Sequence, residues 1–144
     1  MKLKTVFILS SIFISTSAIA DQSYNVTFNN TQNRQAKIVV VSKICMHSAG
    51  DSPIYVNAKS SNSTTIRDSN SIAGCTNGYK QVFWNVYYNN TNYYTQIGFE
   101  HKKHKGWVTQ ITGKNISATC DGIPCSNTGT PGVKAGGPIN ITIN

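Results

Sequence analysis

The chain has 144 residues and a formal net charge of +8, yet only 12% of its residues are charged. This length fits one domain with a modest core, and five side-chain carboxylates leave little material for the carboxylate pair of a glycosidase. The positive excess favours partners with negative surfaces, such as lipid headgroups, acidic glycans or nucleic acid, without selecting among them.

The first element is a predicted secretory signal peptide, residues 1–20. Lys2 and Lys4 give the positive start, residues 6–14 (VFILSSIFI) give the apolar stretch, and residues 18–20 (AIA) give the cleavage pattern. The apolar stretch is shorter than the roughly 20 residues needed to span a bilayer, and no later segment is long enough. We therefore predict a secreted or periplasmic protein, not an integral membrane protein.

The mature chain, residues 21–144, is predicted to form a single β-domain. The signal peptide removes two of the thirteen Lys and Arg residues, which leaves eleven against five acidic side chains and a formal charge near +6. Apolar residues recur with period two, and no stretch of ten or more residues carries a helical stripe. Strands are predicted at 24–28, 36–41 (continuing towards Cys45), 54–56, 63–66, 81–88, 93–100, 106–112, 115–118 and 138–144.

Turn chemistry between these runs favours an antiparallel arrangement. Residues 89–92 (NNTN) predict a hairpin tip, because Asn tolerates positive φ and bonds its own backbone. The short, polar segment 63–66 is typical of an edge strand. The fold class is therefore all-β, a single antiparallel β-sandwich, with a barrel as the nearest alternative.

Four cysteines lie in the mature chain, and an even number in a small exported domain predicts two disulfides. Three pairings are possible. Cys120 and Cys125 enclose a turn-prone stretch, so we favour Cys120–Cys125 and, by elimination, Cys45–Cys75. Metal ligation by these cysteines is not expected, since their spacing contains no CxxC pair.

Aromatic residues concentrate between residues 83 and 107. On the first strand, Trp84 and Tyr88 share one face with Val82 and Val86, whereas Phe83, Asn85 and Tyr87 share the other. On the second, Tyr93, Thr95, Ile97 and Phe99 share a face, and Tyr94, Gln96 and Gly98 share the other. One face must line the core, so the other exposes rings beside amides, a platform for sugars or a membrane interface. The alternative is that this second face packs under a loop or the other sheet.

The order of elements resembles that of small lipid-binding β-sandwich toxins. The features that carry the resemblance are a Trp-bearing aromatic strand pair and a late Gly-rich turn, residues 126–137, before the final strand. No residue motif extends it, so no site residue follows from the resemblance.

A basic run, residues 101–105 (HKKHK), falls between two predicted strands and is expected to form a positive hairpin tip beside Trp107. Each lysine near anionic lipid contributes about 1 kcal/mol, and histidines add charge as pH falls below about 6.5. The alternative is an ordinary solvated tip. The predicted binding residues are Trp84, Tyr87, Tyr94, His101, Lys102, Lys103, His104, Lys105 and Trp107.

These residues predict a non-enzymatic binding protein, effector-like or toxin-like and virulence-associated. It would engage an anionic lipid or glycan surface, with a host or neighbouring-cell protein as a further partner. No cofactor, catalytic residue or nucleic-acid partner is expected. A zinc site at His101 and His104 with Glu100 and His47 is disfavoured, because two histidines three apart do not meet well on a strand.

Two alternatives remain. The first is a small secreted basic hydrolase such as a ribonuclease, with His47 and His101 or His104 as acid and base and Lys103 or Arg67 stabilising the phosphorane. The second is an exported inhibitor or interaction partner of another secreted protein.

Overall fold

The protein is an all-β sandwich with two disulfides, as predicted. The computed structural model describes residues 21–76, 78–103, 106–127, 132 and 136–144, and the predicted signal peptide lies outside them. The strands are β1 (Ser23–Asn30), β2 (Ala36–Ile44), β3 (Met46–Ser48), β4 (Ile54–Val56), β5 (Ser60–Asp68), β6 (Lys80–Tyr88), β7 (Asn92–Lys103), β8 (Trp107–Gly113), β9 (Ile116–Cys120), β10 (Ile123–Pro124) and β11 (Ile139–Ile143).

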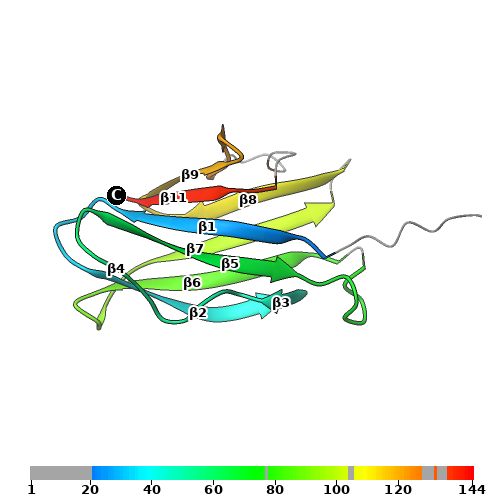
Figure 1. The fold of residues 1–144 in the computed structure, drawn as a ribbon, viewed down its shortest axis with the longest axis horizontal. Helices are drawn as coiled ribbons and strands as arrows, with labels where there is room; N and C mark the ends of the chain where they lie inside the picture. The colour runs from blue at the N-terminus through cyan, green and yellow to red at the C-terminus, as the bar shows by residue number, and fades with distance from the viewer. Residues whose placement is uncertain (1–20, 77, 104–105, 128–131, 133–135) are drawn as a thin grey trace, which may run out of the picture.

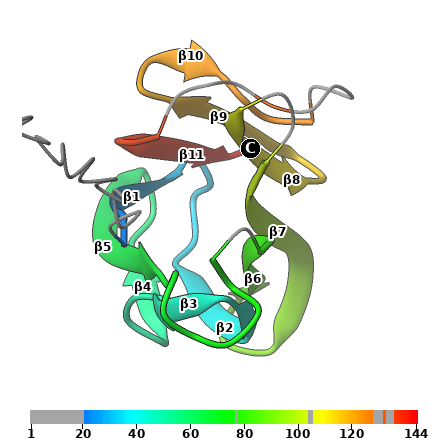
Figure 2. The ribbon, with the colours of Figure 1, turned by 90° about the vertical axis from the view of Figure 1, so that its right-hand side faces the viewer.

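The strands form two layers. One sheet has the order β10-β9-β11-β1-β5-β3 and the other the order β4-β2-β6-β7-β8. Figure 1 shows the strands running along the length of the molecule, and Figure 2 shows the two sheets on opposite sides. All nine predicted strands are present, while the short β3 and β10 were not predicted.

Among the described strands the antiparallel prediction holds for every pair except β1 with β11, which is parallel, and an isolated bridge between Ile111 and Ser126 is parallel as well. Parallel neighbours need a long connection, and here almost the whole domain lies between the two strands. The prediction that residues 63–66 form an edge strand is confirmed in part. Their strand, β5, lies between β1 and β3. However, β3 pairs only with Arg67 and Asp68, so residues 63–66 have a strand neighbour on one side, β1.

One corner of the sandwich is closed by backbone hydrogen bonds between the sheets. The Ile111 N–H of β8 donates to the Cys125 carbonyl at 2.9 Å, and the Asn127 N–H donates to the Ile111 carbonyl at 2.9 Å. The segment after β10 thus continues the five-stranded sheet past its edge. At this corner the sandwich therefore shows the partial closure of a barrel, the alternative that the sequence left open.

Both predicted disulfides are formed. Cys45–Cys75 joins the β2–β3 junction to the loop before β6, and Cys120–Cys125 closes the turn that contains β10. The predicted hairpin tip is also confirmed, since Asn89 and Asn90 both adopt positive φ between β6 and β7.

Candidate functional site

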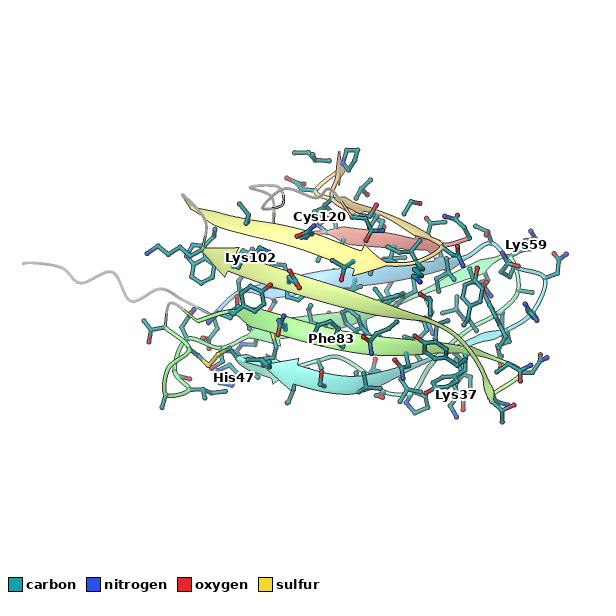
Figure 3. The ribbon with its side chains drawn as sticks, turned by 180° about the vertical axis from the view of Figure 1, so that it is seen from behind. Lys37, His47, Lys59, Phe83, Lys102 and Cys120 are labelled. Atoms are coloured by element: carbon teal, nitrogen blue, oxygen red, sulfur yellow. A yellow bond between two sulfur atoms is a disulfide. The ribbon has the colours of Figure 1, made fainter. Side chains whose placement is uncertain are left out.

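The outward surface of the five-stranded sheet carries a row of aromatic rings with a lysine among them. Lys37 of β2 pairs with Tyr55 of β4 on one side and with Tyr87 of β6 on the other, and Tyr87 pairs with Tyr93 of β7. Tyr93 is 59% exposed and Tyr55 43% exposed. We call this row, together with Phe83, Asn85 and Gln96 beside it, the outer aromatic face; Figure 3 looks onto it.

Hydrogen bonds and ring contacts hold the outer aromatic face in place. The Tyr87 and Tyr93 rings meet edge to face at 6.0 Å between centroids. The Asn85 amide donates to the Tyr87 hydroxyl at 3.1 Å, and the Gln96 amide donates to Asn85 at 3.1 Å. The rings and amides are therefore ordered before any ligand arrives, which lowers the entropy cost of binding.

Phe83 extends the outer aromatic face along the strands, away from the row of tyrosines and towards Lys102. Its strand partner on β7 is Gly98, where a Cβ would lie 2.8 Å from the Phe83 ring. Glycine lets the ring lie close to the neighbouring strand. Lys102 lies beyond Phe83 at one end of the outer aromatic face. Lys37 lies on the opposite side of Phe83, so each end of the face carries a lysine (Figure 3).

A β-bulge reverses the predicted orientation of two tyrosines. The register shifts between Val86 and Tyr87, so that Tyr93 pairs with Tyr87 on the outer side. Tyr94 instead packs against the core, with its ring 4.9 Å from Tyr88 and its hydroxyl donating to the carbonyl of Asn144. The prediction that Tyr94 shares the outward face with Gln96 is wrong, because strict alternation does not allow for the bulge.

The prediction that Trp84 belongs to a binding surface is also wrong. Its side chain is fully buried and meets Phe28 of the opposite sheet at 5.5 Å, edge to face. Trp84 is a core residue that holds the two sheets together. Tyr87, on the opposite face of the same strand, remains half-buried and reaches the surface.

The basic run divides between strand, surface and core. β7 continues through Lys103, so residues 101–103 belong to a strand and not to a tip. Lys103 is exposed, whereas Lys102 is half-buried, ion-paired with Glu100 at 3.2 Å and 5.5 Å from the ring centre of Tyr79. His104 and Lys105 lie outside the described residues. Within residues 101–103, Lys103 is the fully exposed basic side chain, so this part of the run contributes less surface charge than the sequence suggests.

The Glu100 contact keeps Lys102 charged. Partial burial lowers the pKa of Lys102, but the hydrogen bond and negative charge of Glu100 outweigh this, and the net effect is a raised pKa. Burial and a hydrogen bond to Glu100 also raise the pKa of Tyr79. This end of the outer face therefore presents a permanent cation beside a neutral phenol.

His101 lies in the core. It is 7% exposed, stacks on the half-buried Trp107 ring at 4.9 Å with an interplanar angle of 6°, and hydrogen-bonds Thr109 at 2.9 Å. Burial is the main cause that lowers the pKa of His101, and the nearby Lys80 charge lowers it further against the opposing effect of Asp68. The prediction that this histidine adds surface charge at mildly acidic pH is therefore wrong for His101.

A buried polar cluster surrounds His101 at this end of the sandwich. Asp68 accepts the backbone N–H of Gln22 at 2.7 Å and the hydroxyl of Tyr24 at 3.2 Å. Lys80 is 1% exposed, and burial lowers the pKa of its ammonium. Lys80 donates to the carbonyls of Ser69 and Cys75 and to the side chain of Asn70, and so fixes the loop that carries the Cys45–Cys75 disulfide.

The burial of His101 predicts a pH-dependent stability. Its pKa is lower in the folded protein than in the unfolded chain, so between the two values the unfolded chain binds the extra proton. The free energy of unfolding should therefore decrease as pH falls below about 6.5. For one titrating group this decrease is at most about 1.4 kcal/mol per pH unit.

Urea unfolding at pH 7.5 and 5.5 checks this expectation for the wild type and for His101→Phe. The variant should lose less stability between the two pH values. An equal loss in both proteins would contradict the assignment.

A further titratable pair lies at the start of the described residues. His47 Nε2 is 2.9 Å from Asp21, which also meets Arg67 at 3.4 Å. The backbone hydrogen bond from Asn70 is the main cause that lowers the pKa of Asp21, although desolvation opposes it. His47 thus engages an aspartate, whereas His101 engages Thr109.

Comparison with known proteins yields the fold and nothing finer. No protein-family model matches the chain, and no curated protein sequence matches it. The crystal structure of IP-1A from Alcaligenes faecalis superposes with a TM-score of 0.52 at 14% identity, covering 84% of this chain and 89% of that one. This similarity shows a shared fold.

Two further observations concern metal and membrane chemistry. Within the described ranges, no group of three or more His, Cys, Asp or Glu residues is close enough to hold a metal ion. In the same part of the chain, no helix has the length and apolar character required to cross a membrane.

The outward surface of the six-stranded sheet differs from the outer aromatic face. Its strand residues alternate between core and solvent, and the solvent side of the central strands carries mainly hydroxyl and amide side chains, with Arg67 at the end of β5. They include Asn25, Thr27 and Asn29 of β1, Ser61, Ser63 and Thr65 of β5, and Asn140 and Thr142 of β11. Exposed rings therefore distinguish one outer sheet surface from the other.

Proposed function

We propose that the protein is a secreted or periplasmic, non-enzymatic binding protein that engages anionic membrane or glycan surfaces through its outer aromatic face. The observation that carries the proposal is the row Tyr55, Lys37, Tyr87 and Tyr93, in which one lysine lies among three rings on a sheet surface. These side chains lie on the outward surface of the sheet, so the packing of the core does not require them.

The chemistry of the outer aromatic face suits such a surface. Tyrosine rings offer an apolar plane with a polar end, which suits sugar faces and membrane interfaces. Lys37 and Lys102 lie at opposite ends of the face (Figure 3), so a negatively charged surface could meet both. Lysines near anionic lipid each add about 1 kcal/mol and raise the association rate.

The proposed compartment agrees with the covalent structure. Both disulfides are formed among the described residues, and such bonds persist in oxidising compartments outside the cytoplasm. The predicted signal peptide would deliver the chain there.

Three variants measured against phosphatidylserine vesicles and a glycan array test the proposal. The face variant carries Lys37→Ser, Tyr87→Ser and Tyr93→Ser, and should weaken binding by about tenfold or more. The basic-run variant carries Lys102→Ser, Lys103→Ser and Lys105→Ser. It should weaken vesicle binding by about thirtyfold, because Lys103 and Lys105 each contribute about 1 kcal/mol, while the Lys102 charge already faces Glu100.

The matched control changes three side chains on the other sheet, Asn25→Ser, Thr65→Ser and Asn140→Ser, and should bind as the wild type does. If the face variant keeps wild-type affinity for every surface that the wild type binds, the outer aromatic face is not the site. An unchanged affinity of the basic-run variant would show that Lys102, Lys103 and Lys105 do not contribute, and would leave the role of Lys37 to the face variant.

A further inference from the structure

A pocket opens beside β7, at the point where the neighbouring strand β8 has ended and no longer pairs with it. The last pairing of the two strands joins Gly113 to Ile97, and residues 93–96 of β7 continue past this point. Asn127 fixes the end of β8, because its side chain accepts the Gly113 N–H at 3.0 Å and donates to the Gly113 carbonyl at 2.6 Å. The resulting pocket measures about 570 Å³, within the range of about 300–1,000 Å³ for small-molecule sites.

Tyr93 and Tyr94 are the two aromatic residues among the described residues that line the pocket. Tyr94 is held by its contact with Tyr88 and by the hydrogen bond from its hydroxyl to the Asn144 carbonyl. Tyr93 is largely exposed and leans on Tyr87. Ordered rings of this kind present flat faces to the C–H groups of a sugar, while their hydroxyl groups remain near water.

The polar residues of the pocket lining favour a negatively charged ligand. Lys114 is exposed, and its ammonium makes no hydrogen bond or ion pair within the described part of the chain. None of the described residues that line the pocket is Asp or Glu, and none of them forms an ion pair with Lys114. Gln96 is oriented by its donation to Asn85, and its own side-chain oxygen accepts no hydrogen bond from the described residues.

We propose that this pocket binds an acidic sugar residue of a glycan. A ring stacks on Tyr93, a hydroxyl donates to the Gln96 oxygen, and a carboxylate meets Lys114 in a charge-assisted hydrogen bond. The proposal rests on the proposed function and narrows its glycan partner to a carboxylated saccharide. Tyr93 belongs to both the pocket and the outer aromatic face, so one glycan chain can occupy both.

Calorimetric titration with sialyllactose and digalacturonic acid, each beside a neutral counterpart (lactose and α-1,4-linked digalactose), tests the pocket. The wild type should bind at least one acidic saccharide, and its neutral counterpart about tenfold more weakly or not at all. Lys114→Gln should weaken acidic binding by about tenfold, the effect of losing one charge-assisted hydrogen bond. Lys59→Gln, an exposed lysine outside the lining, serves as the matched control.

Three outcomes would overturn the pocket proposal. They are no binding of either acidic saccharide, equal binding of acidic and neutral saccharides, and an unchanged affinity in Lys114→Gln. Vesicle binding by Lys114→Gln, measured in parallel, separates the two proposals. If vesicle binding still depends on Tyr87 and Lys37 while no saccharide binds, the pocket proposal fails and the outer aromatic face stands.

Discussion

Replacing Trp84 with alanine is expected to lower the free energy of unfolding by about 3–5 kcal/mol, the usual cost of removing a large buried aromatic side chain. Trp84 is fully buried, and its ring bridges the sheets by its edge-to-face contact with Phe28. Deleting it removes apolar contacts and leaves a cavity that the two packed sheets cannot close. Urea unfolding followed by circular dichroism measures the loss.

The variant Trp84→Phe gives the matched comparison. The indole Nε1 of Trp84 is buried without a hydrogen-bond partner among the described residues, so phenylalanine removes an unsatisfied donor while keeping an aromatic ring. We expect a smaller loss than with alanine. Tyr93→Ala on the outer aromatic face should cost less than about 1 kcal/mol. A Trp84→Ala loss as small as this would contradict the placement of Trp84 in the core.

Replacing Lys80 with methionine is expected to lower the free energy of unfolding by about 3–5 kcal/mol, although the side chains are similar in length. The Lys80 ammonium serves three acceptors, the carbonyls of Ser69 and Cys75 and the side chain of Asn70. Methionine cannot donate, so these acceptors are left unsatisfied in a buried place. Each such group costs about 1–3 kcal/mol.

Chemical denaturation with a matched surface variant checks the Lys80 prediction. Lys114→Met removes a lysine of the same size that has no partner in the described structure, and should change stability by less than about 0.5 kcal/mol. Lys80→Met should also expose the loop before β6, which hydrogen exchange at residues 69–75 would detect. Equal stability of the two variants would show that the Lys80 hydrogen bonds contribute nothing.

The sequence predicts most of the fold because alternation is a local property. On β6, every second side chain from Lys80 to Tyr88 is buried, and the predicted division of Phe83 and Tyr87 from Trp84 matches this. The hairpin tip follows from the tolerance of Asn89 and Asn90 for positive φ. The parallel β1–β11 pair depends on contacts between the two ends of the domain, which no local pattern encodes.

The candidate site is less predictable, for two physical reasons. The bulge exchanges the orientations of Tyr93 and Tyr94, because it shifts the alternation of side chains along the strand by one residue. The amino-acid composition of the strand does not reveal this shift. The neighbours of a strand are also set by topology. Tyr55 and Lys37 lie far from Tyr87 in sequence, and only the order β4-β2-β6 places them in one row.

Charged residue types also mislead when read alone. Lys80 and His101 look like surface residues in the sequence, yet they pair across β6 and β7 in the buried cluster. Lys80 satisfies its charge through backbone carbonyls of a loop, and His101 is covered by Trp107. Such burial requires partners from several segments, which the local sequence does not reveal.

Binding through the outer aromatic face is tested most directly by a map of backbone amide shifts when the ¹⁵N-labelled protein binds phosphatidylserine nanodiscs or the glycan selected on the array. We expect the largest changes on the strands of the outer aromatic face, around Lys37, Tyr55, Tyr87 and Tyr93, while β1 and β5 stay unchanged. Changes centred on β1 and β5, or none on β6 and β7 under saturating ligand, would contradict binding through this face.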